Sequence, residues 1–447
     1  SDGNAIIAAI KAAAVGGTSS ATQGGITFRA IDKFASGPNP IEQTGDISLF
    51  SPWGPDPELY GVPSVMAPGS MILSTYPTNM GSYAELSGTS MAAPYISGIA
   101  ALVLEARKDQ LDSRKDVKYL IAQTAKPQAS TRSASVGRSP LRQGNGYVDA
   151  YAAATYCILA DRESISLNYT TSTKQISKQF TVRNICSSKS AVVTVENLAA
   201  ESVTQLDAEG HYIGGINVDV AHGANVFIKN LPESNSFDLS PGESFTVEFA
   251  VTPPEYDDNG EEWWFFGGYL FLTAKYGDGS SERSVVRYTG FKGDYPEYPY
   301  FSNDPLLAPQ LYFGNEVVSE DEEYTLYDDS QFTLKYNGIR PSREIKIQIM
   351  TYSPEEGGGY YAWFPFGWHK YAGTNPDYTN PARVFLNTTA YKTADAKVAR
   401  RIEPGAYRAK IHALKLFRTP GSKEGEDYYM WWSTPFTVKD VITSDDN

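Results

Sequence analysis

The spacing of apolar residues separates a helix-containing first part of the chain from a longer part made of strand-like runs. Apolar side chains recur at helical spacing over 4–15, 92–108 and 114–123, and short strand-like runs occupy 26–31, 62–66 and 71–75. Mixed helices and strands predict an α/β arrangement for this first part, up to about residue 155.

From Cys157 onward, β-branched and aromatic runs recur with turn residues between them. Seven such runs are 165–169, 178–185, 191–197, 225–231, 244–251, 268–275 and 283–291. After a Pro-rich break at 294–299, further runs follow at 323–326, 331–336, 345–350, 383–387, 406–417 and 435–441. Short strands joined by Gly, Pro and Asp turns favour two packed sheets, so two all-β sandwich domains are predicted.

The second β region is rich in aromatic residues, which gather at 360–368 and 428–432. Such residues either pack across neighbouring strands in a β core or form a surface that binds carbohydrate or peptide. The sequence leaves both interpretations open.

Composition and charge narrow the function classes. With 38 Lys and Arg against 52 Asp and Glu among 447 residues, the net charge of −14 repels phosphate backbones, so nucleic-acid binding is not expected. The longest apolar run in a helical pattern, 96–104, is far shorter than the roughly 20 residues that span a bilayer, so no membrane span is expected. The start, Ser1-Asp2-Gly3-Asn4, shows no signal peptide, and we expect it to lie inside a longer protein.

Two cysteines, Cys157 and Cys186, lie near the predicted domain junction. They either form a disulfide or remain two buried thiols. N-glycosylation sequons at Asn168 and Asn387 fit a secretory route, which favours the disulfide and predicts glycans at both asparagines.

One segment stands out as candidate chemistry. It reads Leu86-Ser87-Gly88-Thr89-Ser90-Met91-Ala92-Ala93-Pro94 and leads directly into a helical run. Gly88 permits a tight turn that places Ser90 at a helix start, where its own backbone N–H and the helix dipole favour a developing oxyanion. Pro94 is expected in the first turn, where N–H groups have no intrahelical acceptor. A simple Ser/Thr helix cap is the alternative for the Thr89-Ser90 pair.

The string G-T-S-M-A-x-P, which includes Thr89 and Met91, resembles the nucleophile motif of the subtilisin-like serine proteases. Three further segments resemble parts of the same family. Residues 46–55 resemble its strand that ends in an S-x-x-G-P turn, and residues 65–75 resemble its A-P-G turn and the strand after it. Residues 142–150 resemble its G-x-G-x-V-x-A segment. The resemblance implies hydrolysis of protein or peptide substrates by a Ser90 nucleophile, without cofactor or metal. More loosely, the opening helix resembles the end of an inserted protease-associated domain. The two β domains resemble the fibronectin-III-like modules of large secreted fungal subtilases.

The resemblance therefore implies four regions of an extracellular protein: the tail of an insert at 1–40, the C-terminal part of a catalytic domain at 41–156, and fibronectin-III-like or immunoglobulin-like sandwiches at 157–293 and 300–447.

The catalytic set is incomplete in these 447 residues. A serine needs a histidine base held by a carboxylate, and in this family Asp, His and an oxyanion Asn precede the serine. The four histidines, His211, His222, His369 and His412, all follow Ser90. We therefore expect the isolated chain to be inactive and an upstream segment to supply Asp and His. The alternative is a catalytically dead relic whose β domains bind a partner or a cell-wall polymer.

Other site types find little support. His222-Gly223-Ala224-Asn225-Val226 superficially resembles the family's histidine motif, but its place among strands predicts a loop or strand histidine. The cysteines and histidines lack zinc-ligand spacing. The acidic clusters 257–258 and 320–323 are expected to be exposed loops rather than calcium sites.

Overall fold

A computed structural model describes residues 20–23, 26–29, 46–56, 59–107, 110–206, 212–256, 263–301, 308–320, 322–327, 330–336, 338, 342–352, 359–363, 369–372, 382–386, 389–390, 400–415 and 426–442. The chain divides into two compact units, Ser1–Ser48 and Leu49–Asn447. In the first unit, β1 (Ser20–Gln23) and β2 (Ile26–Arg29) pair as an antiparallel hairpin. The helix expected at 4–15 lies outside the described residues.

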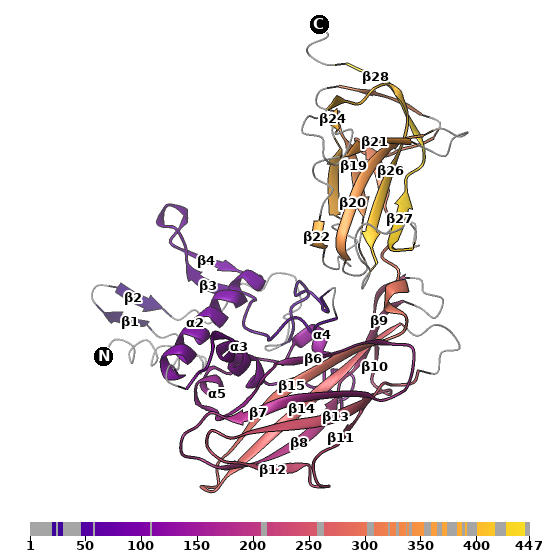
Figure 1. The fold of residues 1–447 in the computed structure, drawn as a ribbon. Helices are drawn as coiled ribbons and strands as arrows, with labels where there is room; N and C mark the ends of the chain where they lie inside the picture. Colours follow the sequence, from indigo (N-terminus) through magenta and orange to yellow (C-terminus); the bar gives the residue numbers. More distant parts are fainter. Residues whose placement is uncertain are drawn as a thin grey trace. The chain divides into compact units, whose positions relative to one another are not determined.

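Three helices of the second unit share one apolar core and lie side by side (Figure 1). They are α2 (Thr89–Arg107), α3 (Arg114–Gln123) and α5 (Ala150–Thr155). Val103 of α2 and Leu120 of α3 are fully buried in this core, together with Ala153 of α5. Shorter elements are the hairpin β3 (Ile72–Thr75) with β4 (Tyr83–Leu86), the 3-10 turn η1 (Thr78–Met80) and α4 (Pro140–Gln143). The two predicted helices in this region are confirmed.

Two strands expected here are not present. Among residues 62–66 only Met66 pairs, in an isolated bridge with Tyr147, and residues 46–48 have no regular structure. The physical reason at 62–66 is that the Ser64 carbonyl accepts hydrogen bonds from the Asn145 N–H at 2.9 Å and the Arg287 guanidinium at 3.1 Å. These partners occupy the place of a neighbouring strand.

The first β domain consists of two sheets around one core. The larger sheet contains β6 (Ser164–Thr170), β8 (Ala191–Ala199), β9 (Ser202–Leu206), β10 (Tyr212–Asp219), β12 (Ser236–Leu239), β14 (Trp264–Tyr276) and β15 (Ser281–Lys292). The smaller sheet has the order β11 (Asn225–Ile228), β13 (Ser244–Thr252), β7 (Ile176–Asn184) and β5 (Ile158–Ala160). Phe180 and Phe249 of the smaller sheet and Leu270 of the larger one are fully buried in the shared core.

The second β domain repeats this organisation with its own core, which includes Phe332, Ile347 and Ile411. One sheet has the order β17 (Glu316–Val317), β16 (Gln310–Phe313), β19 (Phe332–Tyr336) and β23 (Ala382–Leu386). The other contains β18 (Glu323–Leu326), β28 (Phe436–Val441), β26 (Gly405–Leu414), β20 (Ser342–Thr351), β21 (Gly359–Trp363), β22 (His369–Ala372) and β27 (Tyr428–Trp432). A separate pair is β24 (Thr389–Ala390) with β25 (Arg400–Arg401).

The predicted α/β part followed by β domains is confirmed, while the fibronectin-III or immunoglobulin assignment stays a prediction. β10 was not predicted, because Gly214-Gly215 interrupts its alternation, and its partner β9 was not predicted either. The Pro-rich break forms a 3-10 turn, η2 (Tyr295–Glu297), and its Tyr295 is fully buried. In β27, Tyr429 and Trp431 pack against the core, which favours the packing interpretation for that aromatic run.

Asp149 fixes the start of α5 and gives a pH-dependent contribution to stability. Its carboxylate accepts the Ala152 N–H at 2.9 Å and pairs with the Lys126 ammonium at 2.6 Å. Burial opposes ionisation, but these two partners outweigh it and hold the pKa of Asp149 below its ordinary value.

We expect Asp149→Ala to lower the free energy of unfolding by about 1 kcal/mol, because the N-cap acceptor is lost. Asp149→Asn keeps the cap and loses only the charge. The difference between wild type and Asp149→Asn should be present above the unfolded aspartate pKa of about 3.9 and close as pH falls through the lower folded pKa. Urea titrations at several pH values measure this, and a pH-independent difference would contradict it.

Candidate active site

Ser90 lies at the start of α2 with its side chain exposed, which confirms the predicted placement. Gly88, just before the helix, has a φ of +155°, a conformation that favours glycine. Its carbonyl accepts the Met91 N–H at 3.0 Å, which closes the turn around Ser90. Backbone N–H groups in the first turn of a helix lack intrahelical acceptors, so the Ser90 N–H is a candidate oxyanion donor.

A neighbouring extended segment holds this turn in place. The Gly88 N–H donates to the Gly69 carbonyl at 2.7 Å, and the Met71 N–H donates to Ser87 Oγ at 2.8 Å. A Cβ on Gly69 would lie 3.0 Å from the Gly88 carbonyl oxygen, so a side chain at this position would press on the Gly88 backbone. The A-P-G turn and the nucleophile turn therefore form one hydrogen-bonded unit.

The other motif segments are joined by backbone hydrogen bonds. The Met66 N–H donates to the Gly146 carbonyl at 2.8 Å, and the Val148 N–H donates to the Met66 carbonyl at 3.0 Å. The Gly54 N–H donates to the Leu141 carbonyl at 2.8 Å. Segments that are far apart in the sequence are thus hydrogen-bonded to one another.

Pro94 does not lie in the first helical turn, contrary to expectation. It is the sixth residue of α2, inside the helix. A proline has no N–H to donate to the carbonyl four residues before it, which here belongs to Ser90. The structure therefore deprives the Ser90 carbonyl of its intrahelical donor.

The structure brings no described histidine to Ser90. His222 follows β10 in a loop, and its Nδ1 lies 2.9 Å from Asp219 Oδ2, which agrees with the prediction of a loop or strand histidine. His412 is buried in β26 of the second β domain. His211 and the side chain of His369 lie outside the described residues. Within the part of the chain that the structure describes, no hydrogen bond to the Ser90 hydroxyl is present.

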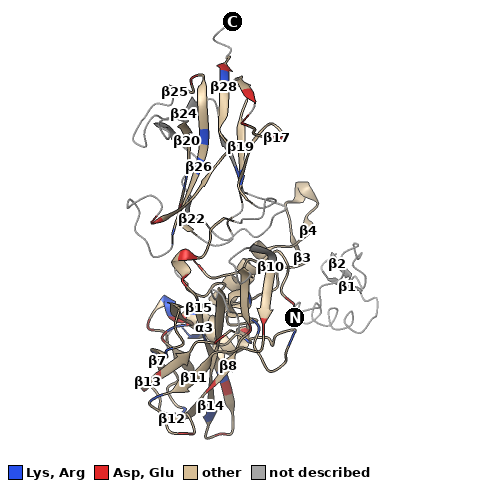
Figure 2. Ribbon diagram, turned by 90° about the vertical axis from the view of Figure 1, so that its right-hand side faces the viewer, with Lys and Arg blue, Asp and Glu red and all other residues tan. Residues whose placement is uncertain are grey.

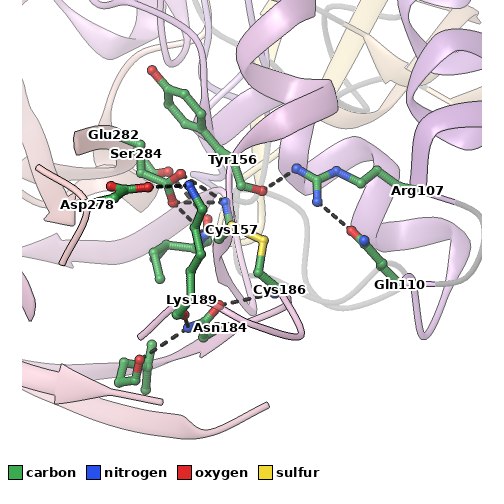
Figure 3. Close-up of a disulfide and its surroundings, with 12 residues drawn as sticks. Arg107, Gln110, Tyr156, Cys157, Asn184, Cys186, Lys189, Asp278, Glu282 and Ser284 are labelled. Carbon is green, nitrogen blue, oxygen red and sulfur yellow. Dashed lines mark hydrogen bonds and ion pairs between the residues drawn. A yellow bond between two sulfur atoms is a disulfide. The ribbon is translucent and has the colours of Figure 1, made fainter. Parts of the chain in front are cut away.

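Cys157 and Cys186 form a disulfide with Cα atoms 5.1 Å apart, as favoured from the sequence (Figure 3). Next to it, the Arg107 guanidinium at the end of α2 donates to the Tyr156 carbonyl at 2.6 Å. The Glu282 carboxylate of β15 accepts the Cys157 N–H at 2.9 Å, and burial raises its pKa. The sequence did not single out Arg107 or Glu282: Arg107 ends an apolar helical run, and Glu282 stands among polar residues.

The remaining predicted sites have mixed outcomes. Asn168 is exposed, with a φ of +60°, and its glycosylation stays a prediction. Asn387 lies outside the described residues. Among the residues described, no group of three or more His, Cys, Asp and Glu side chains could hold a metal ion.

The helix α2 is apolar over a longer stretch than the run 96–104 that the sequence indicated. An 18-residue stretch of α2 has a mean hydropathy of 1.3, so by length and composition alone the helix could cross a membrane. Of this stretch, 11% is buried. Its buried Val103 and the contact from Arg107 to Tyr156 are those of a helix packed in a globular domain.

Comparisons with known proteins agree with this geometry. Residues 4–146 match the Subtilase family (Peptidase_S8). The PII-type proteinase of Lactococcus lactis subsp. cremoris is 25% identical over 368 residues, covering 70% of this chain and 18% of that protein. The C5a peptidase of Streptococcus pyogenes serotype M3 is 25% identical over 351 residues, covering 74% of this chain and 28% of that protein.

The chain thus spans less than a third of the length of either relative. A PapD-like domain of human CEP192 aligns with 30% of this chain and 84% of its own, at 12% identity and a TM-score of 0.23, too low to support an argument. The family match includes Ser90 and the segments 65–75 and 86–94. Residues 4–146 of this chain are therefore similar to the subtilisin-like protease family.

Proposed function

We propose that the chain is part of a serine endopeptidase in which Ser90 is the nucleophile. The observation that carries this proposal is the exposed Ser90 at the start of α2, in a turn held by the Gly88 N–H on the Gly69 carbonyl. A fluorophosphonate probe, which bonds to activated serines, tests the assignment directly. The names of the relatives, a proteinase and a peptidase, support protein or peptide substrates.

In the proposed reaction, Ser90 Oγ attacks the carbonyl carbon of the scissile peptide bond. A histidine removes the hydroxyl proton and later gives it to the leaving amine, and a carboxylate orients that histidine. The Ser90 N–H at the positive end of α2 stabilises the oxyanion. Since all four histidines of this sequence follow Ser90, we propose that a separate segment carries the Asp, the His and the oxyanion Asn.

An exposed apolar surface supports the existence of such a partner segment. Among the described residues, most exposed large apolar side chains lie between 49 and 104, and on α2 they include Tyr95 at 49% and Leu102 at 55% exposure. The hairpin β3–β4 adds Leu73 and Tyr83 and is tan over most of its length in Figure 2, with Glu85 as its charged residue. Exposed apolar surface often marks a place that another protein segment covers, so we infer that the proposed Asp/His segment packs here.

Replacing Leu102 by aspartate tests this surface. Leu102 is half exposed, so Leu102→Asp should change the free energy of unfolding by less than about 0.5 kcal/mol. It should nevertheless abolish binding of an upstream Asp/His segment, because the charge would be buried in the new interface. Titration calorimetry with that segment measures the binding.

The matched control is Phe227→Asp, which changes a side chain of 62% exposure on the first β domain and should leave both properties unchanged. Equal binding of the segment to Leu102→Asp and to wild type would contradict the assignment of this face.

The proposal also includes an extracellular location, fibronectin-type β domains and glycosylation. The Cys157–Cys186 disulfide supports an extracellular protein, since such bonds persist in oxidising compartments. The two-sheet organisation supports fibronectin-type modules, and the exposed Asn168 is available for a glycan.

A further inference from the structure

We infer that Arg287, on β15 of the first β domain, is a positioning residue for the nucleophile turn of Ser90. The inference rests on the proposed function for the role of Ser90, but its structural part is independent of catalysis. It means that the first β domain forms part of the catalytic unit.

Arg287 is fully buried, and its guanidinium lies against two segments of the α/β part. Nη1 donates to Asn145 Oδ1 at 2.7 Å and to the Ser64 carbonyl at 3.1 Å, and Nη2 donates to the Gly61 carbonyl. Burying a charge is costly unless it is paired and hydrogen-bonded, so these acceptors are held close to the guanidinium. One side chain of the β domain therefore fixes the chain at 61–64 and at 145.

Glu163 and Asn145 complete the cluster. Glu163 Oε1 lies 3.9 Å from Arg287 Nη2 and accepts the Ser64 hydroxyl at 2.9 Å. The Asn145 amide donates to the Val285 carbonyl of β15 at 3.1 Å. Ser64 is thus held by its carbonyl, through Arg287 of β15, and by its hydroxyl, through Glu163 directly before β6.

The backbone from Ser64 onward carries this restraint to the nucleophile. Two residues later, Met66 is hydrogen-bonded on both sides to the chain at 146–148. Three residues further, the Gly69 carbonyl accepts the Gly88 N–H, two residues before Ser90. The Arg287 cluster lies at one end of this extended segment and the nucleophile turn at the other.

A lysine cannot replace the guanidinium in this cluster. Arg287 offers a planar fork to three acceptors at once, whereas an ammonium carries all its donors on a single nitrogen. A Cβ on Gly61 would lie 2.8 Å from Arg287 Nε, so the backbone packs directly on the guanidinium. Arg287→Lys therefore keeps the charge but releases part of the 61–64 segment.

Hydrogen exchange of the purified 447-residue chain tests the inference without any activity. In Arg287→Lys, the amides of Met66 and Gly88 should exchange at least about tenfold faster, while amides in the β13–β7 ladder should keep their wild-type rates. The matched control is Arg283→Lys on the same strand, where Arg283 is 54% exposed and its guanidinium lies over Phe271. This control should leave the Met66 and Gly88 rates unchanged.

Wild-type exchange at Met66 and Gly88 in a folded Arg287→Lys would overturn the inference. If that variant does not fold, Ser64→Ala removes only the hydrogen bond to Glu163, and exchange of both amides should still rise about threefold. Wild-type rates in Ser64→Ala would then overturn it.

Catalytic relevance is measured separately, as the rate of fluorophosphonate labelling in the presence of the upstream Asp/His segment. Arg287→Lys should lower the maximal labelling rate about tenfold with little change in the probe concentration at half-saturation. An unchanged maximal rate would overturn the link to Ser90. If wild type itself does not label, the proposed function fails, whereas the exchange result still decides the positioning role.

Discussion

Joined to an upstream segment that carries Asp and His, this chain is expected to be labelled by a fluorophosphonate at Ser90, and Ser90→Ala should abolish that labelling. The isolated chain should react slower by about 10⁴-fold or more, because a serine hydroxyl without a histidine base is a weak nucleophile. Mass spectrometry of the labelled peptide locates the modified residue. This is the largest effect we expect, since the reaction depends on this one oxygen atom.

The matched control is Ser97→Ala, which removes another exposed hydroxyl of α2, one that donates to the Ala93 carbonyl at 3.2 Å. It should leave the labelling rate unchanged. Strong labelling of the isolated chain that is lost in Ser90→Ala would show that one of the four histidines after Ser90 supplies the base. No labelling even with the Asp/His segment would favour a catalytically dead relic.

Replacement of both Cys157 and Cys186 by alanine is expected to lower the free energy of unfolding by roughly 3 to 4 kcal/mol. The two residues are 29 positions apart, so the bridge closes a loop of that size in the unfolded chain and removes part of its conformational entropy. Because Arg107 also contacts the Tyr156 carbonyl beside this bridge, the loss should loosen the end of α2 as well. Urea unfolding followed by tryptophan fluorescence gives the free energy.

Reduction of the wild-type chain should reproduce this loss, and a reducing agent should have no effect on the double variant. That comparison separates the missing bond from any packing change caused by alanine. A difference below about 1 kcal/mol between oxidised wild type and the double variant would contradict the prediction.

The sequence determined the features that depend on neighbouring residues. The string from Gly88 to Pro94 specified a serine at a helix start, because a glycine turn and helix formers act over a few positions. Alternating runs indicated β domains after Cys157, since the period of two reports one buried face. The sequence favoured a disulfide between the two cysteines but left free thiols as an alternative. The structure, with the two Cα atoms 5.1 Å apart in a disulfide, decided between them.

The tertiary structure alone decided the contacts that join distant segments. Asn145 and Arg287 are far apart in the chain, and neither stands in a periodic pattern that would reveal a buried pair. Residues 62–66 have the composition of a strand, yet the Ser64 carbonyl bonds to Arg287. Strand propensity describes how a side chain fits a half-buried sheet, whereas the partner of each backbone carbonyl is set by what the whole fold places beside it.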